Sequence, residues 1–306
     1  MTAMTTERWV NFWLVDAFAS EPFQGNPAGV VLEAEGLEAE TMRLVAREVG
    51  ASETAFLLPA GEEAADFTLR WFTSTCEVPF CGHATLATAH ILAETGRYRP
   101  PTELTFSTRR GLLRIRLCPS GEAPCIPMVQ TPAAHFEPCP IPPGELAAAL
   151  LTSPEQLHPD LPLLKDDTHL FVPFRRLEAL LNLGPDFRLL SRLGLEYELT
   201  GFACFTTETL EPTSHWHLRF FAPAAGINED PVTGAAQGPM AVYLLEQGVL
   251  SGQAGQTGSW VGEQGDALQR PGRVQVEVSL DEAGHVRQVY IGGPAVTVLQ
   301  GRLRVG

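Results

Sequence analysis

Glu53 is the first of three polar residues in this 306-residue chain that stand where acid/base chemistry is possible. It lies between Gly50 and an apolar, strand-like run that begins at Phe56. A carboxylate at the entry to an apolar strand is at risk of burial, and burial raises its pKa toward neutrality. That shift suits a general acid or base. The same residue could instead be a cap or an exposed glutamate at a strand edge.

His83 and Asp230 are the other two residues, and each stands at the predicted start of a helix. His83 follows Gly82, where the helix dipole favours a neutral imidazole that can shuttle a proton. Asp230 precedes Pro231 and can accept a hydrogen bond from a substrate amine or hydroxyl. Both have structural alternatives, because a lone histidine is often a satisfied core residue and an Asp-Pro pair often starts a turn or a helix.

Cys81 directly precedes Gly82, and a thiol at a helix N-terminus is acidified. Its counterpart in the second half of the chain is Thr233, so a mechanism with one thiol on each face of a carbon lacks one thiol. No phosphate-binding loop or serine-nucleophile elbow follows a predicted strand. The histidine spacing suggests no third ligand, so we expect no metal site.

An internal repeat relates these residues. The triplet Arg70–Phe72 is echoed by Arg219–Phe221, and each triplet ends a predicted strand before a proline-containing loop. The loops lead to Gly82 and Gly234, from which the two halves align without a gap. We therefore predict two copies of one strand–loop–helix unit. The matches at an offset of 152 are Leu92 with Leu244, Glu94 with Glu246, and Gly96 with Gly248.

The helix in each copy is uncharged. Residues 84–92 and 236–245 contain no Asp, Glu, Lys or Arg, and a helix that is apolar on every face is a buried helix. Strands are predicted on both sides of each helix in the sequence. The predicted fold class is therefore mixed α/β (α+β), with two similar domains in which a sheet curls around a central helix.

Both predicted helices begin with small residues at a glycine, which leaves their first amides open to a ligand. The helix dipole adds partial positive charge at that end. Two such ends, one from each domain, would form an anion pocket at the domain interface that fits a small carboxylate. Ordinary turn glycines that open core helices would give the same pattern.

The elements that must position these residues follow from local patterns. Residues 12–18 and 28–32 predict a hairpin, and residues 38–49 predict a helix that Gly50 ends. Residues 119–143, rich in proline, predict a linker. Further strands are predicted at 56–58, 67–72, 103–117 (two strands around Gly111), 201–206, 217–221, 273–280, 286–291 and 295–305, and short helices near 144–151 and 176–181.

Charge and composition disfavour several partners. The 21 Lys and Arg residues against 36 Asp and Glu give a net charge of −15, which repels nucleic acid. The longest uncharged stretches are shorter than the roughly 20 residues that span a membrane. The N-terminus has no secretory signal pattern, and the six cysteines form no CxxC pair. We expect a cytoplasmic protein with reduced thiols.

Four short blocks follow one another along the chain: Val15-Asp16-Ala17-Phe18 with Gly25-Asn26-Pro27, Ser52-Glu53-Thr54-Ala55-Phe56, Cys81-Gly82-His83-Ala84-Thr85, and Glu229-Asp230-Pro231-Val232-Thr233-Gly234. Together they resemble the PhzF-like family, the phenazine-biosynthesis isomerase group that shares the fold of diaminopimelate epimerase. The resemblance implies a curled, mostly antiparallel sheet around a central helix in each domain. It implies an N-terminal domain of residues 1–118 with 295–306, a C-terminal domain of residues 119–294, an active site between them and a homodimer.

The resemblance also implies a function. Glu53 matches the acid/base glutamate of the family, His83 its helix-start histidine and Asp230 its aspartate, and the phenazine enzyme shifts a proton on a dihydro-hydroxyanthranilate without cofactor or metal. One departure is Ala235, where that enzyme has a substrate-binding serine; the backbone amide remains able to bind a carboxylate. The expected substrate-binding residues are Ser52, Gly82, Thr233, Gly234 and Ala235.

The sequence thus predicts a cofactor-independent isomerase that moves a proton on a small amino or hydroxy carboxylic acid. Two alternatives stay open. One is an amino-acid racemase or epimerase that uses Glu53 and Cys81 as its two bases. The other is a non-catalytic protein that binds a small molecule, which the change to Ala235 motivates.

Overall fold

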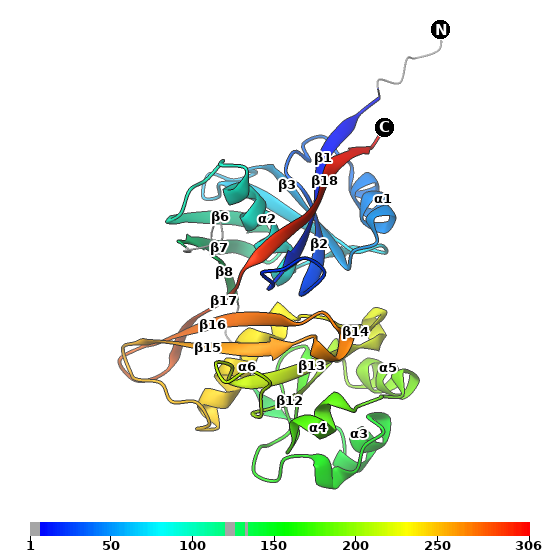
Figure 1. Ribbon diagram of the computed structural model, residues 1–306, viewed down its shortest axis with the longest axis vertical. Helices are drawn as coiled ribbons and strands as arrows, with labels where there is room; N and C mark the ends of the chain where they lie inside the picture. The colour runs from blue at the N-terminus through cyan, green and yellow to red at the C-terminus, as the bar shows by residue number, and fades with distance from the viewer. Residues whose placement is uncertain (1–6, 120–125, 132–133) are drawn as a thin grey trace. The chain divides into compact units, whose positions relative to one another are not determined.

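The chain folds into two compact units. The computed structural model describes residues 7–119, 126–131 and 134–306. The first unit comprises residues 1–130 and 292–306, and the second comprises residues 131–291 (Figure 1). Among the described residues, no helix is both long enough and apolar enough to cross a membrane.

The first unit contains one sheet in the order β18-β1-β2-β3-β4-β6-β7-β8, with β5 beside β4. The β2–β3 and β4–β6 pairs are parallel and the others are antiparallel. The strands are β1 (Trp9–Ala17), β2 (Asn26–Val31), β3 (Glu53–Pro59), β4 (Phe67–Phe72), β5 (Glu77–Val78), β6 (Thr102–Thr108), β7 (Gly111–Cys118), β8 (Ile126–Thr131) and β18 (Ala295–Arg304), and the helices are α1 (Ala39–Val49) and α2 (Gly82–Glu94).

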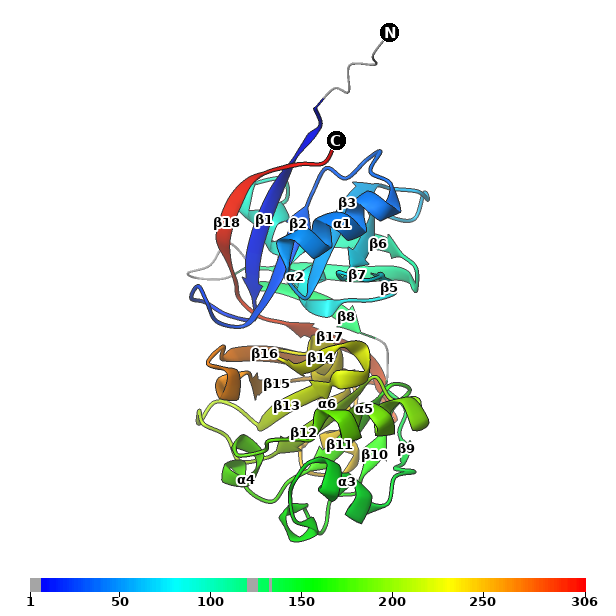
Figure 2. The ribbon, with the colours of Figure 1, turned by 90° about the vertical axis from the view of Figure 1, so that its right-hand side faces the viewer.

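Helix α2 is the centre of this unit. Every residue from Gly82 to Leu92 is buried, and the helix contacts β1, β2, β3, β7 and β18 (Figure 2). The hydroxyls of Thr85 and Thr88 donate to the carbonyls of Cys81 and Ala84, so these two buried hydroxyls are satisfied by the helix backbone. The prediction of a buried helix inside a curled sheet is confirmed.

The second unit has the sheet order β9-β10-β11-β12-β13-β15-β16, with β14 beside β13. Its central helix α6 is buried along most of its length. The strands are β9 (Glu137–Pro138), β10 (Leu164–Lys165), β11 (His169–Pro173), β12 (Gly201–Thr206), β13 (Trp216–Ala222), β14 (Ile227–Asp230), β15 (Thr257–Gln264), β16 (Gly272–Leu280) and β17 (Val286–Gly292), and the helices are α3 (Pro143–Ala149), α4 (Leu177–Leu181), α5 (Phe187–Glu196) and α6 (Gly234–Glu246).

The two units repeat one pairing scheme. The pairs β2–β3, β3–β4, β4–β5, β4–β6 and β6–β7 run parallel, antiparallel, antiparallel, parallel and antiparallel. The pairs β11–β12, β12–β13, β13–β14, β13–β15 and β15–β16 follow in the same order with the same directions. The central helix follows β5 in one unit and β14 in the other. The repeat read from the sequence is therefore a repeat of topology.

The sequence patterns missed some elements. The predicted linker over residues 119–143 is wrong at residues 126–131, where β8 pairs antiparallel with β7 and extends the first unit. Residues 120–125 and 132–133 of that linker lie outside the described part of the chain. Strand β15 and helix α5 were also not predicted.

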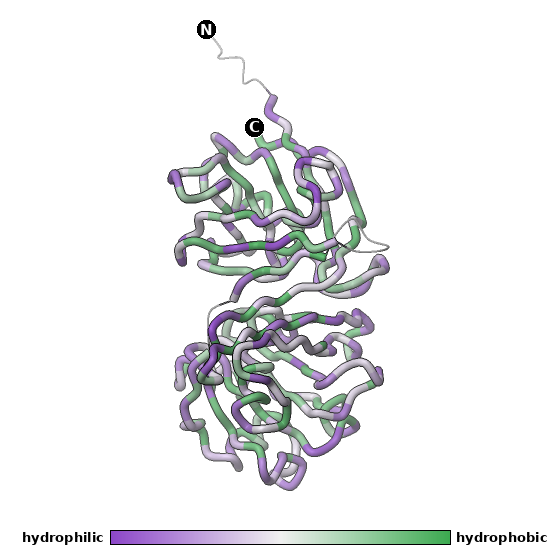
Figure 3. Tube along the Cα trace, turned by 90° about the vertical axis from the view of Figure 1, so that its left-hand side faces the viewer, coloured by the Kyte–Doolittle hydropathy of each residue, from purple (hydrophilic) through white to green (hydrophobic). Residues whose placement is uncertain are grey.

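Figure 3 shows hydrophobic stretches along the strands of each unit and hydrophilic residues at many outer turns.

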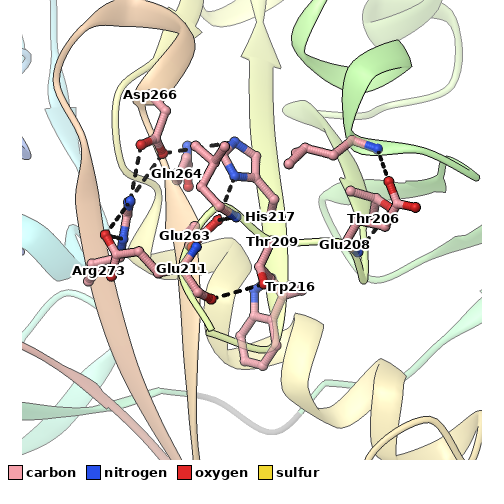
Figure 4. A network of polar contacts seen from close by, with 12 residues as sticks. Thr206, Glu208, Thr209, Glu211, Trp216, His217, Glu263, Gln264, Asp266 and Arg273 are labelled. Atoms are coloured by element: carbon pink, nitrogen blue, oxygen red, sulfur yellow. Dashed lines mark hydrogen bonds and ion pairs between the residues drawn. The ribbon is translucent and has the colours of Figure 1, made fainter. Parts of the chain in front are cut away.

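Glu263 ties the loop between β12 and β13 to β15 (Figure 4). Its carboxylate accepts hydrogen bonds from the amides of Leu210 and Glu211, at 2.8 and 2.7 Å, and lies 2.9 Å from Nδ1 of His217. The side chains of Glu263 and His217 are fully buried. Burial raises the pKa of Glu263, but the hydrogen bonds outweigh it and bring the value to about 2.

We expect Glu263→Gln to lower the free energy of unfolding at neutral pH by about 1–3 kcal/mol, because a buried charge-assisted network is broken. The pKa of Glu263 is lowered in the folded state, so its stabilisation is present above the ordinary value of 4.5 and is lost as the pH falls toward 2. Urea unfolding between pH 7 and pH 3 should show a shallower acid decline than in the wild type. The exposed Glu62→Gln is the matched control, and equal stability of the two variants at both pH values would contradict this role.

Candidate active site

Glu53 opens strand β3 at the point where β3 pairs in parallel with β2, opposite Ala28. Its side chain is only 15% exposed. Burial raises the pKa of this carboxyl, and a hydrogen bond with Ser52 opposes the shift without cancelling it. The side chain is therefore largely enclosed and is not an exposed glutamate at a strand edge, while its role as acid or base stays a prediction.

His83 faces Glu53 from the first turn of α2. Its Nε2 atom lies 3.4 Å from Oε2 of Glu53 and 3.2 Å from Oγ of Ser52. The His83 side chain is 8% exposed. The start of β3 and the start of α2 thus bring together Ser52, Glu53 and His83, three of the residues named from the sequence. Gly82, which directly precedes His83 in the chain, is buried. A carboxyl, an imidazole and a hydroxyl at these distances can exchange protons.

Cys81 adds a thiol to this group. It is the residue before α2, and its Sγ lies 3.5 Å from Nδ1 of His83. Glu53, Cys81 and His83 each offer one atom that could bind a metal ion, and these three atoms lie within 4.8 Å of one another. A metal ion could contact all three at that spacing, whereas the sequence predicts no metal site. The same spacing suits proton transfer between the side chains, which needs no ion.

The turn between β1 and β2 supports Ser52. The Oδ1 atom of the buried Asn26 lies 3.4 Å from the Ser52 hydroxyl. Gly25, just before it, has φ +59, and a Cβ atom there would lie 2.1 Å from the carbonyl oxygen of Ala17. Only glycine therefore fits this approach. The sequence pointed to Gly25 and Asn26 through the family resemblance and gave them no role.

Asp230 ends β14 in the second unit and is 9% exposed. Its Oδ2 atom accepts a hydrogen bond from the Thr233 hydroxyl at 2.6 Å. Gly234 and Ala235 form the first turn of α6, where no earlier helical carbonyl accepts their amides. The structure thus brings together the four residues predicted in this half of the chain. Gln264, which also contacts this group, was missed because a lone glutamine in a strand forms no recognisable motif.

Equivalent arginine–glutamate pairs anchor both helix starts. Arg70 binds Glu77 through two hydrogen bonds of 2.8 Å, and Arg219 binds Glu229 in the same way. Glu77 and Glu229 stand four residues before Cys81 and Thr233. Each pair therefore holds the segment that leads into the central helix. Arg219 also donates to the carbonyls of Leu180, Leu181 and Leu183, at 3.0, 3.1 and 2.8 Å.

The sequence model of a family described as "Phenazine biosynthesis-like protein" matches residues 15–301. The chain belongs to this family. An uncharacterized isomerase of Clostridium acetobutylicum is 33% identical over 303 residues, which cover 97% of this chain and 98% of that protein. The crystal structure of a PhzF-family phenazine biosynthesis protein from Bacillus anthracis matches with a TM-score of 0.88 at 30% identity, and covers 97% of this chain and 99% of that one.

A more distant structure shares the fold. A hydroxyproline epimerase from Agrobacterium vitis, with bound trans-4-hydroxy-L-proline, matches with a TM-score of 0.62 at 13% identity over 97% of this chain and 93% of that one. The predicted family and epimerase-like fold are confirmed. The protein is an isomerase of the PhzF kind, and the alternative of a non-catalytic binding protein is set aside.

We expect Arg219→Lys to lower the free energy of unfolding by about 1–3 kcal/mol, because lysine cannot bind Glu229 and the α4 carbonyls with one planar group. Arg70→Lys is the matched control. The Arg70 and Glu77 side chains are 27% and 15% exposed, against 8% and 10% for Arg219 and Glu229. The control should therefore cost less, about 0–1 kcal/mol. Thermal unfolding compares the two, and a larger loss for Arg70→Lys would refute this ranking.

Proposed function

We propose that this protein is a cofactor-independent isomerase in which Glu53 moves a proton on a small amino or hydroxy carboxylic acid. The observation that carries the proposal is the buried Glu53 carboxyl, whose pKa is raised by burial and whose Oε2 lies 3.4 Å from His83. A raised pKa brings a carboxyl closer to the operating pH, where it can both accept and return a proton. Glu53 takes the proton from one carbon and delivers it to another.

His83 and Ser52 orient Glu53 and relay protons to it. Nε2 of His83 is within reach of both the Glu53 carboxyl and the Ser52 hydroxyl. The contact with Ser52 favours the ionised form of Glu53, while burial favours the neutral form. The two effects therefore act on the Glu53 pKa in opposite directions, and burial is the larger one.

The substrate carboxylate is bound, in this proposal, by the open amides at the helix starts, which include those of Gly82, Gly234 and Ala235. These amides and the helix dipoles also stabilise negative charge that develops during proton removal. Asp230 accepts a hydrogen bond from the substrate amine or hydroxyl. The predicted homodimer and the cytoplasmic location stay predictions from the sequence.

The test is deuterium incorporation in D₂O, followed by proton NMR. Trans-2,3-dihydro-3-hydroxyanthranilate and a panel of small amino and hydroxy acids are incubated with wild type and with Glu53→Gln, each with and without EDTA. We expect one compound to exchange with the wild type, equally in EDTA, and at least about 10²-fold more slowly with Glu53→Gln. Undiminished exchange in Glu53→Gln would exclude Glu53 as the base.

Stability provides the control for Glu53→Gln. The pKa of Glu53 is raised in the folded state, so its contribution to stability is largest at low pH and is lost as the pH rises through the folded-state pKa. Replacing the buried carboxylate by a neutral amide removes this penalty. The variant should therefore unfold at or above the wild-type temperature at neutral pH, which separates lost chemistry from lost fold.

The contact of Cys81 with His83 motivates a second candidate, an epimerase in which Glu53 and Cys81 are the two bases, although two bases on opposite faces of one carbon need a wider separation than the 4.8 Å within which these groups lie. The Sγ atom of Cys81 lies 3.5 Å from His83 and shares the same group of side chains with Glu53. If Cys81 is a base, Cys81→Ser should reduce exchange at the α-carbon at least about 10²-fold, because a hydroxyl is a far weaker base than a thiolate. Full exchange in Cys81→Ser would remove this candidate and leave the one-base isomerase.

A further inference from the structure

We propose that Gln264 and Thr233 are positioning residues that act on substrate only through Asp230. The inference rests on the proposed function, in which Asp230 accepts a hydrogen bond from the substrate. Thr233 was expected from the sequence to bind substrate itself. The hydrogen bonds around it assign its groups to other partners.

Gln264 lies on β15, and both the oxygen and the nitrogen of its side-chain amide form hydrogen bonds. Its Oε1 accepts from the backbone amide of Thr233 at 2.9 Å. Its Nε2 donates to the backbone carbonyl of Asp230 at 2.9 Å and to the Thr233 hydroxyl at 3.0 Å. The backbone fixes this orientation, because an N–H group only donates and a carbonyl only accepts.

The Thr233 hydroxyl is oriented by this amide. Because Gln264 donates to its oxygen, its single proton is directed to Oδ2 of Asp230, at 2.6 Å. A hydrogen bond this short is typical of a hydroxyl that donates to an ionised carboxylate. The Thr233 amide is bound to Gln264 as well. Thr233 therefore gives both of its donor protons to the protein and holds the Asp230 carboxyl in one orientation.

A second, fully buried layer holds Gln264. Nε2 of Gln237, on α6, donates to Oε1 of Gln264 at 3.1 Å, and Nε1 of Trp216 donates to Oε1 of Gln237 at 2.6 Å. Gln264, Gln237 and Trp216 are all 0% exposed. At Gly262 a Cβ atom would lie 2.2 Å from Oε1 of Gln237, so the backbone makes room for this layer. A satisfied buried network of this kind resists rotation of its members.

The repeat shows how the two units differ. Thr233 and Cys81 occupy equivalent positions 152 residues apart, each directly before its central helix. The Cys81 thiol lies beside His83 and the proton-transfer group. The Thr233 hydroxyl is instead bound between Gln264 and Asp230. The side chain before the central helix lies beside the proton-transfer group in the first unit, whereas in the second unit it supports an acceptor.

A double-mutant cycle tests the inference with the compound that exchanges deuterium in the panel. Thr233→Val removes the hydroxyl at nearly constant volume and should lower kcat/KM about tenfold, mainly through KM. Thr233→Ser restores a hydroxyl and should recover most of the loss. In an Asp230→Asn background, Thr233→Val should have less than about a twofold effect, because its target is already changed. An equal loss in both backgrounds would show that Thr233 contacts the substrate itself and would overturn the inference.

A measurement without substrate separates this inference from the proposed function. In protein labelled with ¹³C at Asp carboxyls, Asp230→Asn identifies the Asp230 signal. Its titration midpoint should rise in Thr233→Val and in the uncharged Gln264→Met, which cannot donate to Thr233, and should stay in place in Thr233→Ser. An unchanged midpoint in Thr233→Val overturns the inference, whereas undiminished exchange in Glu53→Gln overturns the proposed function alone.

Discussion

Burial of one helix on every side is the constraint on which the rest of this structure depends. Helices α2 and α6 are surrounded by the strands of their own units, so their sides have no water to solvate a charged group. Their sequences accordingly contain small and apolar residues, and the charged residue of each comes only at its last position, Glu94 or Glu246. The first-turn amides of each helix have no helical partner, which is why we propose that they bind the substrate.

The carboxyl groups near these helix starts differ in what their surroundings favour. Arg219 and Glu229 form a closely bonded pair, and Asp230 accepts the Thr233 hydroxyl. Glu53 differs, because burial outweighs its hydrogen bond with Ser52 and raises its pKa. Groups whose environment disfavours their charged form tend to occur at active sites, since the same shift that costs stability tunes reactivity. This contrast within one chain supports Glu53 as the acid/base residue.

The sequence predicted what depends on local pattern. The absence of charge predicted both buried helices, the repeated triplets predicted the common topology, and the apolar run after Glu53 predicted its burial. It did not predict β8, because the proline-rich composition around residues 126–131 is typical of loops and the strand exists only through its pairing with β7. The role of Gln264 could not be predicted from the sequence for a similar reason. Its role arises from contacts 27 to 34 residues away in the chain, which no spacing rule reveals.

A direct titration of the Glu53 carboxyl shows whether burial makes this residue a proton carrier. In protein labelled with ¹³C at the Glu side-chain carboxyl, the signal lost in Glu53→Gln is assigned to Glu53 and followed with pH. We expect a midpoint clearly above the ordinary value of 4.5, and a lower midpoint when a substitution exposes the site to water. A midpoint at or below 4.5 in the folded protein would show that burial does not tune Glu53 for proton transfer.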